Sequence, residues 1–320
     1  MNVFHVFGKG KLLIKEKCLV LEKYENNRKI SQKIPIENVD IIFCNGLIGL
    51  SPLSVNKILS RGVKTFFLNN YGSVKGVLLP IDRIFSTFQI KQYEAFKNRR
   101  IEIAKEIVNS IKISSMFALS HIKEYEYVKE LGNLEIEAND IRELMGVESE
   151  IWRIIYSFLK DLEINFEERV YNPPKGELNS IISYGNSLLY SYVLVELLEH
   201  EFNPLIGFLH DLSERRNSLA LDLSESLKPI LIILLNSEIV KRKILNQNHF
   251  EDNKEYTYLN LLGKVIYSSY FENFMRMKFI KLLDGRKVSP IWILRKEVEN
   301  LKKSLENDIR FDSVWRRVCL

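Results

Sequence analysis

The sequence predicts an α+β protein, with a small N-terminal β domain followed by a larger all-α C-terminal domain. Over roughly the first 80 residues, short segments rich in valine, isoleucine and phenylalanine alternate with turn residues, as is typical of strands. Beyond Pro80 the segments lengthen, glycine and proline become rare, and apolar residues recur at helical spacing. We therefore expect a β domain over residues 1–82, a linker over 83–90 and a helical domain over 91–320.

Turn residues divide the N-terminal part into strands. Gly8-Lys9-Gly10 and the residues at 25–27 separate the first segments, and Asn69-Asn70-Tyr71-Gly72 predicts a turn that opens a hairpin. One short helix over 51–60 is expected to interrupt the strands.

The C-terminal part reads as a series of helices. A mostly helical passage covers 85–131, and Asn139-Asp140 is a start signal for a helix through 141–162. Pro173-Pro174 marks an interior loop because proline cannot continue a helix. Further helices are expected over 178–200, 219–243, 259–280 and 290–307.

Composition favours a globular protein that does not enter a membrane. The chain has 320 residues, of which 46% are hydrophobic and 27% charged. Its only long aliphatic run, 230–235, is far shorter than the roughly 20 residues that span a bilayer. The N-terminus lacks the pattern of a secretory signal, so we expect a cytoplasmic protein. Cys18, Cys44 and Cys319 have no spacing typical of a disulfide framework or a zinc site.

The net charge of +5 is unevenly distributed. Residues 275–320 contain twelve Lys or Arg against six Asp or Glu, a local balance of +6. Such a segment can bind phosphates or can simply be a solvated helix face, and charge alone favours the second interpretation.

Three acidic residues interrupt otherwise apolar helices. Glu148 shares a predicted helix face with Ile151 and Trp152, and Asp222 and Glu225, three residues apart, share another. His210 precedes the second helix. Each can be structural by itself, as a core histidine or a helix-surface acid. Together, carboxylates and one imidazole suit Mg²⁺ or Mn²⁺ better than zinc.

The same segments resemble the Cas1 family, the CRISPR-associated integrases of spacer acquisition. "NPLIGFLHDLSERRNSLALDLSESLKP" is similar to the family's P-x-x-G-F-x-H block followed by S-L-x-x-D-L-x-E. "MGVESEIWRIIY" resembles its G-x-E block, and "NPPKGELN" its P-P segment with a following asparagine. The resemblance extends over nearly the whole chain and includes the order of the two domains.

The resemblance implies a metal-dependent catalytic site. Glu148, His210 and Glu225 fall on the family's positions for catalytic residues that bind Mg²⁺ or Mn²⁺. Asp222 and Asn179 match auxiliary positions that support these ligands. Lys228 stands where arginine is frequent, which keeps the charge but loses the bidentate fork. The segment 109–116 lacks a G-K-I-x-N-Q pattern found in many members.

The implied activity is DNA integration. Members join 3′-hydroxyl ends of captured DNA fragments to a repeat array by transesterification, and metal-dependent nicking follows from the same chemistry. The implied partners are double-stranded DNA, as prespacer and repeat array, a second copy of the chain that pairs through the β domain, and a small second CRISPR-associated protein in a heterohexamer. The residues that we expect to bind nucleic acid are Arg83, Arg215, Arg216, Lys228, Arg276, Lys278, Arg286 and Lys287.

Three other functions stay open at this point. A metal-dependent nuclease that acts on branched DNA in repair would use every residue named above. A non-catalytic DNA-binding scaffold on the same fold would have no reason to keep carboxylates on apolar faces. A transposon integrase that acts without CRISPR would be told apart by neighbouring genes.

Overall fold

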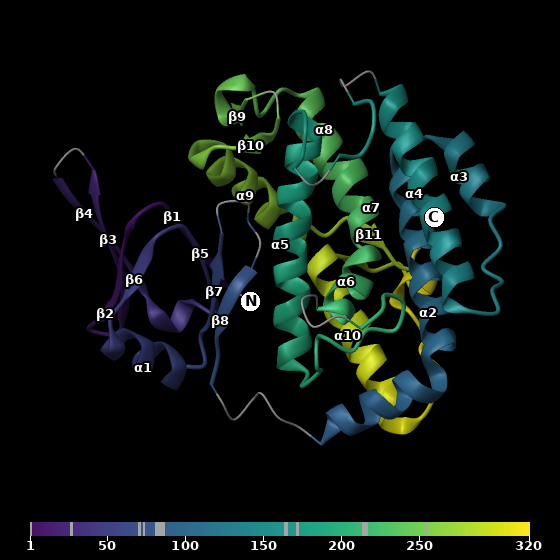
Figure 1. Cartoon of the computed structure of the whole chain (residues 1–320), viewed down its shortest axis with the longest axis horizontal. Coiled ribbons are helices and arrows are strands. Elements are labelled where there is room, and N and C mark those ends of the chain that lie inside the picture. Colours follow the sequence, from purple (N-terminus) through teal and green to yellow (C-terminus); the bar gives the residue numbers. More distant parts are fainter. Residues whose placement is uncertain are drawn as a thin grey trace. The chain divides into compact units, whose positions relative to one another are not determined.

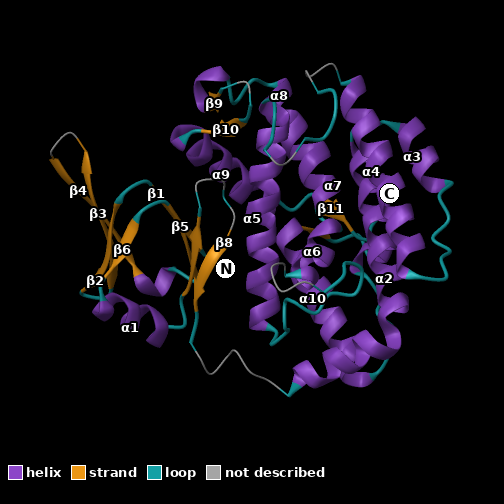
Figure 2. Ribbon diagram, viewed as in Figure 1, coloured by secondary structure: helices purple, strands orange, loops and turns teal. Residues whose placement is uncertain are grey.

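In a computed structural model, the chain forms two compact units, Met1–Phe85 and Ser86–Leu320 (Figure 1). The first unit is built mainly of strands and the second mainly of helices, which confirms the predicted fold class (Figure 2). The structure describes residues 2–25, 28–69, 72, 74–80, 87–162, 166–170, 173–212, 217–253 and 255–320.

The first sheet of the N-terminal unit has the strand order β1-β5-β7-β8. Its strands are β1 (Val3–Phe7), β5 (Ile41–Asn45), β7 (Lys64–Leu68) and β8 (Val74–Leu78). The first three run parallel, and β7 pairs with β8 antiparallel, so the predicted hairpin is confirmed.

The second sheet has the order β4-β3-β2-β6. It consists of β4 (Arg28–Pro35), β3 (Cys18–Glu25), β2 (Gly10–Lys15) and β6 (Ile48–Leu50). The predicted short helix is α1 (Pro52–Ser60), where the Ser51 hydroxyl accepts a hydrogen bond from the Ser54 amide and Pro52 occupies the first turn.

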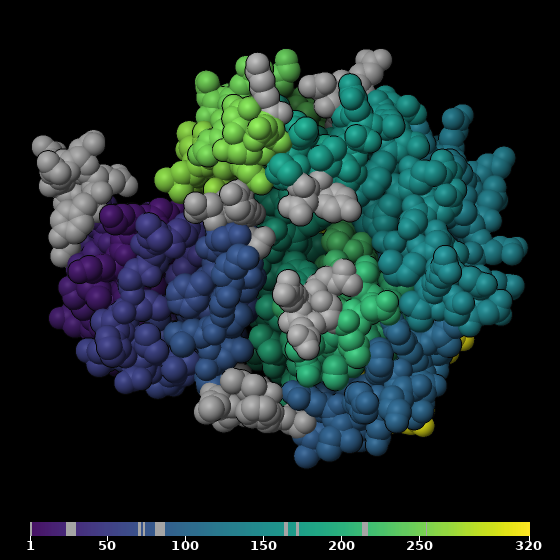
Figure 3. Space-filling model, viewed as in Figure 1, coloured from purple at the N-terminus to yellow at the C-terminus, as the bar shows by residue number. Residues whose placement is uncertain are grey.

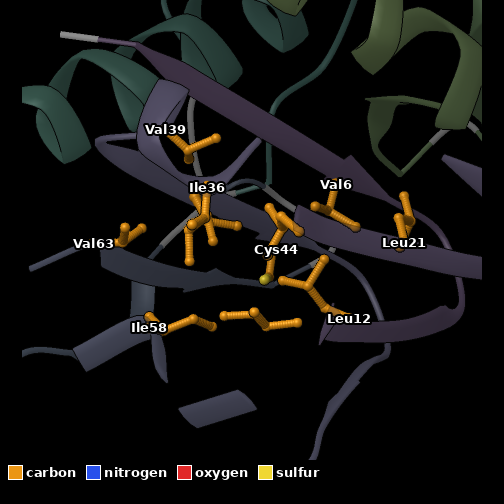
Figure 4. Packing of buried hydrophobic residues seen from close by; sticks show 11 residues of the cluster. Val6, Leu12, Leu21, Ile36, Val39, Cys44, Ile58 and Val63 are labelled. Carbon is orange, nitrogen blue, oxygen red and sulfur yellow. The ribbon is translucent and has the colours of Figure 1, made fainter. Parts of the chain in front are cut away.

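The core of this unit contains side chains from both sheets and from α1. Val6, Leu12, Cys44 and Ile58 are among its fully buried members (Figure 4). Burial raises the pKa of the Cys44 thiol to about 12, so this cysteine is a packing residue and not a nucleophile.

Nine α-helices lie in the described part of the second unit. They are α2 (Phe88–His121), α3 (Tyr125–Gly132), α4 (Ile141–Asp161), α5 (Glu177–Glu199), α6 (Ser218–Glu225), α7 (Lys228–Ile230), α8 (Ser237–Lys241), α9 (Leu261–Arg276) and α10 (Pro290–Asn307). Two short antiparallel pairs accompany them: β9 (Phe250–Asp252) with β10 (Thr257–Leu259), and β11 (Ile280–Lys281) with β12 (Lys287–Val288). The helix α6 lies between α2 and α5 and contacts both (Figure 1).

Two of the predicted helices differ from the observed ones. The range 219–243 is not one helix: α6 ends at Glu225, α7 starts just before Pro229, and a π-helical segment, Leu231–Asn236, precedes α8. Pro229 supplies no amide proton to the preceding turn, so the helix is interrupted there. The range 259–280 is too long at both ends, because Asn260 caps the start of α9 and the helix ends at Arg276.

The start of α4 is as predicted. The Asp140 carboxylate accepts a hydrogen bond from the Glu143 amide at 2.8 Å, and the Glu143 carboxylate accepts one from the Asn139 amide at 2.6 Å. This reciprocal pair satisfies amides that an unpaired helix end would leave open. It fixes the phase of the helix that carries Glu148.

Helix α2 begins at Phe88, so the last residues of the range predicted as a linker are already helical. The helix α5 is long and apolar enough to cross a membrane by length and composition only. However, 72% of that apolar window is buried inside the protein. Its contacts with α6 and α10 are those of a core helix.

The C-terminal segment packs against its own unit. Phe311, Val314 and Trp315 are buried, and the last strand-like residues bond to β11. The buried Glu106 carboxylate of α2 accepts hydrogen bonds from Nε and Nη2 of Arg316, both at 2.5 Å. A buried carboxylate on α2 thus holds the end of the chain.

This ion pair gives a stability prediction. Arg316→Ala leaves Glu106 buried with its main counter-charge removed, so the free energy of unfolding should fall by about 2 to 3 kcal/mol. Arg317→Ala is the matched control, because Arg317 pairs with Asp312 at 3.0 Å on the surface. Its effect should be below about 0.5 kcal/mol. Equal losses in urea unfolding of the two variants would contradict this account.

Candidate active site

Asp222 organises the turn that carries His210. Its side chain is 0% exposed, and its carboxylate accepts hydrogen bonds from the amides of Phe208 at 2.5 Å, Leu209 at 2.9 Å and His210 at 3.0 Å. The Nδ1 of His210 lies 2.7 Å from Asp222 Oδ1. Four donors therefore compensate this buried carboxylate, as its burial requires.

This contact also selects the form of the imidazole. In the neutral imidazole, Nδ1 of His210 carries the proton because the carboxylate of Asp222 is the acceptor, and Nε2 then keeps its lone pair. Asp222 does not use Nε2, so this nitrogen can bind a ligand. The contact is in keeping with the auxiliary role predicted for Asp222.

Gly207 is required where the loop passes close to α6. A Cβ atom at this position would lie 2.8 Å from Oδ2 of Asp222 and 2.8 Å from Cβ of Ser218. Only a residue without a side chain lets the backbone approach this closely. The glycine of the P-x-x-G-F-x-H block thus permits the hydrogen bonds that Asp222 accepts.

Glu148 lies on the buried face of α4 and is 8% exposed. Burial raises the pKa of its carboxyl to about 7, and the negative charge of Glu225 adds to this effect. The charges of His210 and Lys228 lower the pKa in the opposite direction. Glu148, Glu225, His210 and Lys228 are therefore close enough to affect one another electrostatically.

Glu225 is only half satisfied by the protein. It is 4% exposed, and its Oε1 accepts a hydrogen bond from the Lys228 ammonium group. Its second oxygen, Oε2, is buried and has no hydrogen-bond partner among the described residues. A buried carboxylate oxygen without a partner costs free energy, so this atom is suited to receive a cation.

A cavity of about 820 Å³ opens beside these carboxylates. Charged residues of both signs and two aromatic rings dominate its wall, in which Trp152 and Tyr156 stack with centroids 5.7 Å apart. Asn186 also lines it, and its buried Oδ1 has no hydrogen-bond partner within the described ranges. The charged lining residues are Glu148, Arg153, Lys160, Glu168, Arg169, Glu225 and Lys228.

The basic and aromatic part of this wall was missed by the sequence analysis. Glu148, Trp152, Tyr156 and Lys160 are spaced by four residues and line the cavity along one row of α4. This spacing is visible in the sequence. Arg169 comes from a loop, and no sequence signal could have placed it here.

Asn179 holds the loop that carries Arg169. Its Nδ2 donates to the carbonyls of Glu168 and Lys175 at 2.9 Å each, and its Oδ1 accepts from Arg169 Nη1 at 3.0 Å and Val170 N at 3.2 Å. All four positions of the amide are thus used on this loop. Asn179 supports the cavity through Arg169, and none of these bonds reaches Glu148, His210 or Glu225.

The residues predicted to bind nucleic acid are dispersed. Arg83, Arg215 and Arg216 lie outside the described residues, and Lys228 lies inside the site as the partner of Glu225. Four others are exposed and do not line the cavity. Arg276 pairs with Glu272 at 3.5 Å, Arg286 pairs with Asp284 at 2.7 Å, and the exposed residues Lys278 and Lys287 lie nearby in the sequence.

The donor set fits a hard divalent cation. In the part of the chain that the structure describes, no three His, Cys, Asp or Glu side chains are already close enough to hold a metal ion. The chemistry nevertheless matches. Glu225 Oε2 has no hydrogen-bond partner among the described residues, and burial together with the charge of Glu225 disfavours the charged form of Glu148. The neutral imidazole of His210, with Nδ1 bound to Asp222, leaves the lone pair of Nε2 for a ligand. Carboxylate oxygens with one imidazole suit Mg²⁺ or Mn²⁺.

The fold is shared with solved structures over nearly its whole length. A CAS1 protein from Thermotoga maritima superposes with a TM-score of 0.81 at 29% identity, covering 98% of this chain and 99% of that one. The structure titled "Casposase bound to integration product" gives a TM-score of 0.82 at 20% identity, covering 99% and 94% of the two chains. The architecture is thus that of the Cas1 and casposase structures.

Sequence comparison shows to which family of proteins with this architecture the chain belongs. A CRISPR-associated endonuclease Cas1 of Thermodesulfovibrio yellowstonii is 30% identical, over 96% of this chain and 97% of its own length. A protein of the same name from Nanoarchaeum equitans is 31% identical, over 97% and 98% of the two chains. The family model described as "CRISPR associated protein Cas1" matches residues 4–273. The chain belongs to the Cas1 family, which confirms the resemblance of its motifs.

The raised pKa of Glu148 gives a pH prediction for the metal-free protein. The folded-state pKa of about 7 exceeds the ordinary value of 4.5, so the contribution to stability is full below about pH 4.5 and is lost as pH rises through 7. Between about pH 5 and 8, wild type should lose up to about 3 kcal/mol relative to Glu148→Gln. Urea unfolding in a chelator measures this difference. Parallel pH profiles would contradict it.

Proposed function

We propose that this chain is a metal-dependent DNA integrase and endonuclease of CRISPR adaptation. The proposal depends on one observation: Glu148, Glu225 and Lys228 line the cavity, and His210 is close enough to affect Glu148 electrostatically. In the described part of the chain, Glu225 Oε2 has no hydrogen-bond partner. Membership of the Cas1 family supports it, and several similar relatives are named as endonucleases.

Glu148, His210 and Glu225 would hold Mg²⁺ or Mn²⁺. When bound, such an ion supplies positive charge for the phosphoryl oxygens and lowers the cost of an alkoxide-like nucleophile. Asp222 orients the imidazole of His210 from behind, and Lys228 balances the charge of Glu225 when no ion is present. Asp222 and Lys228 would thus fix the orientation of His210 and the charge balance at Glu225.

The proposed reaction conserves the number of phosphodiester bonds. The 3′-hydroxyl oxygen of a captured fragment forms a bond to a phosphorus atom at the repeat border, and the bond from that phosphorus to the existing 3′ oxygen breaks. The proton of the attacking hydroxyl ends on the departing hydroxyl or on solvent. No energy source is needed, because one phosphodiester replaces another. With water as nucleophile, the same site nicks DNA.

The basic residues of the cavity wall are suited to hold the DNA backbone near these carboxylates. Lys160 and Arg169 line the cavity together with Glu148 and Glu225. Cationic side chains contribute most of the affinity for phosphates, and that contribution falls as salt rises. The outer basic residues that the sequence suggested would bind DNA farther from the reacting phosphate.

The proposed assembly contains two copies of the chain, a small second CRISPR-associated protein in a heterohexamer, and double-stranded DNA as prespacer and repeat array. Support comes from the structure titled "Cas6-RT-Cas1--Cas2 complex", one chain of which shares this fold with a TM-score of 0.79. This chain covers 36% of that longer chain at 18% identity, so the likeness concerns the fold. A protein that acts on such DNA would work in the cytoplasm, as the sequence analysis expects.

The function is tested by a half-site integration assay with the full chain, its small partner and Mg²⁺ or Mn²⁺. His210→Ala should reduce strand joining by more than about 100-fold, because it removes the imidazole that Asp222 orients. His200→Ala is the control, since His200 Nδ1 contacts the Glu196 carbonyl and takes no part in the site. DNA binding in a mobility-shift assay should survive both changes.

The outcomes separate the competing functions. Strand joining that persists in His210→Ala would contradict the proposed site. Cleavage of branched DNA without joining in wild type would favour a repair nuclease. DNA binding without either reaction would favour a scaffold.

A further inference from the structure

The loop that presents His210 has little regular structure of its own. Residues 202–212 form turns and bends between α5 and the residues before α6. Backbone amides and carbonyls in such a segment need partners from elsewhere, and the identity of the partners determines the path of the chain. Asp222 supplies the partner for three of its amides, as described above.

Gln92 of α2 binds the first half of this loop. Its side chain is fully buried, and its Nε2 donates to the carbonyls of Asn203 and Ile206 at 2.9 Å each. Its Oε1 accepts from the Asn203 amide at 2.8 Å. The side-chain amide of Gln92 therefore supplies the hydrogen bonds that a neighbouring strand or helical turn would otherwise give to this stretch of backbone.

Arg100 of α2 binds the second half. Its Nε donates to the Phe208 carbonyl at 2.9 Å, and its Nη2 donates to the Leu209 carbonyl at 3.4 Å and to Asp211 Oδ1 at 2.8 Å. The guanidinium lies 5.0 Å from the centroid of the Phe96 ring, which limits its movement. The contacts of Arg100 flank His210 on both sides in the sequence.

Gln92, Phe96 and Arg100 are spaced by four residues and follow one row along α2. The first turns of α2 lie at the surface of the helical unit (Figure 3). Ile90 and Tyr93 of these turns are exposed, whereas the side chains of Gln92 and Arg100 bind the loop. Through Gln92 and Arg100, this row of side chains therefore contacts the loop from Asn203 to Asp211.

Phe208 and Leu209 are held from two opposite sides. Their amides donate to the anionic Asp222, and their carbonyls accept from the cationic Arg100. A peptide segment fixed by an anion and a cation has little freedom to rotate. The backbone of the next residue, His210, therefore starts from a fixed position and direction.

We propose that Gln92 and Arg100 are positioning residues for His210. They act through the backbone of the loop, and they hold the imidazole where Asp222 can bind Nδ1 and leave Nε2 directed toward the site. The catalytic consequence rests on the proposed function, whereas the effect on the imidazole does not. Without the hold of Arg100, His210 would exchange between positions and between tautomers.

A purely structural role is the alternative, and the adjacent residue provides a matched control. Arg99 lies on the same helix and binds the end of α10 through the Ser304 and Ile309 carbonyls and Asp308. Arg99→Lys removes a comparable multi-point contact without touching the loop. An effect that depends only on stability would appear equally in Arg99→Lys and Arg100→Lys.

The experiment uses ¹⁵N-labelled full-length chain in a chelator at about pH 8, where an ordinary imidazole is neutral. The ring signals of His210 are assigned by their loss in His210→Ala. Wild type should show a single tautomer protonated at Nδ1, and Arg99→Lys should show the same. In Arg100→Lys the ¹⁵N chemical shifts of the two ring nitrogens should approach each other, because the two tautomers mix. The kcat of strand joining should fall at least tenfold, with little change in KM for DNA.

Asp211→Asn is a milder second variant that does not endanger folding, because the Asp211 side chain is 85% exposed. It weakens the orientation of Arg100 and should shift the same signals in the same direction by a smaller amount. Unchanged ring signals in Asp211→Asn together with Arg100→Lys, or equal shifts in Arg99→Lys, would overturn the proposal. If wild type joins no DNA, the proposed function fails, and the ring signals still decide the positioning role.

Discussion

The buried carboxylate of Asp222 is the interaction on which the site depends. It is completely enclosed, and it accepts from three consecutive amides and from the ring of His210. An anion buried in this way would be costly without those donors, and the donors belong to the loop that carries the histidine. The same contacts therefore offset the free-energy cost of burying Asp222 and hold His210 in place. These contacts are possible because Gly207 has no side chain and its backbone can lie close to Asp222.

Around this rigid part, the remaining charges are only partly compensated. Lys228 binds one oxygen of Glu225, the other oxygen has no partner among the described residues, and Glu148 is destabilised in its charged form by burial and by Glu225. Asp222 is thus fully compensated, whereas Glu225 is half satisfied and the charged form of Glu148 is disfavoured, and such perturbed carboxylates are typical of functional sites. Positive charge that enters the site would favour the charged form of Glu148 and offset its repulsion from Glu225.

Much of this arrangement could be predicted from local sequence, because helical spacing and caps are local. The start of α4 at Asp140 and the inward direction of Glu148 followed from such signals. The contact of Asp222 with three loop amides could not be predicted, since the path of the loop depends on Gln92 and Arg100, more than a hundred residues earlier in the chain. The site itself therefore depends on tertiary contacts.

In the proposed site, Asp222 would prepare His210 to bind a metal ion through Nε2. The most direct measurement is the affinity for Mn²⁺, followed by electron paramagnetic resonance, in wild type, Asp222→Asn and His210→Ala. Both substitutions should weaken binding by at least about tenfold, because Asp222→Asn leaves the imidazole unsupported and His210→Ala removes it. Wild-type affinity in Asp222→Asn, with loss only in His210→Ala, would contradict it.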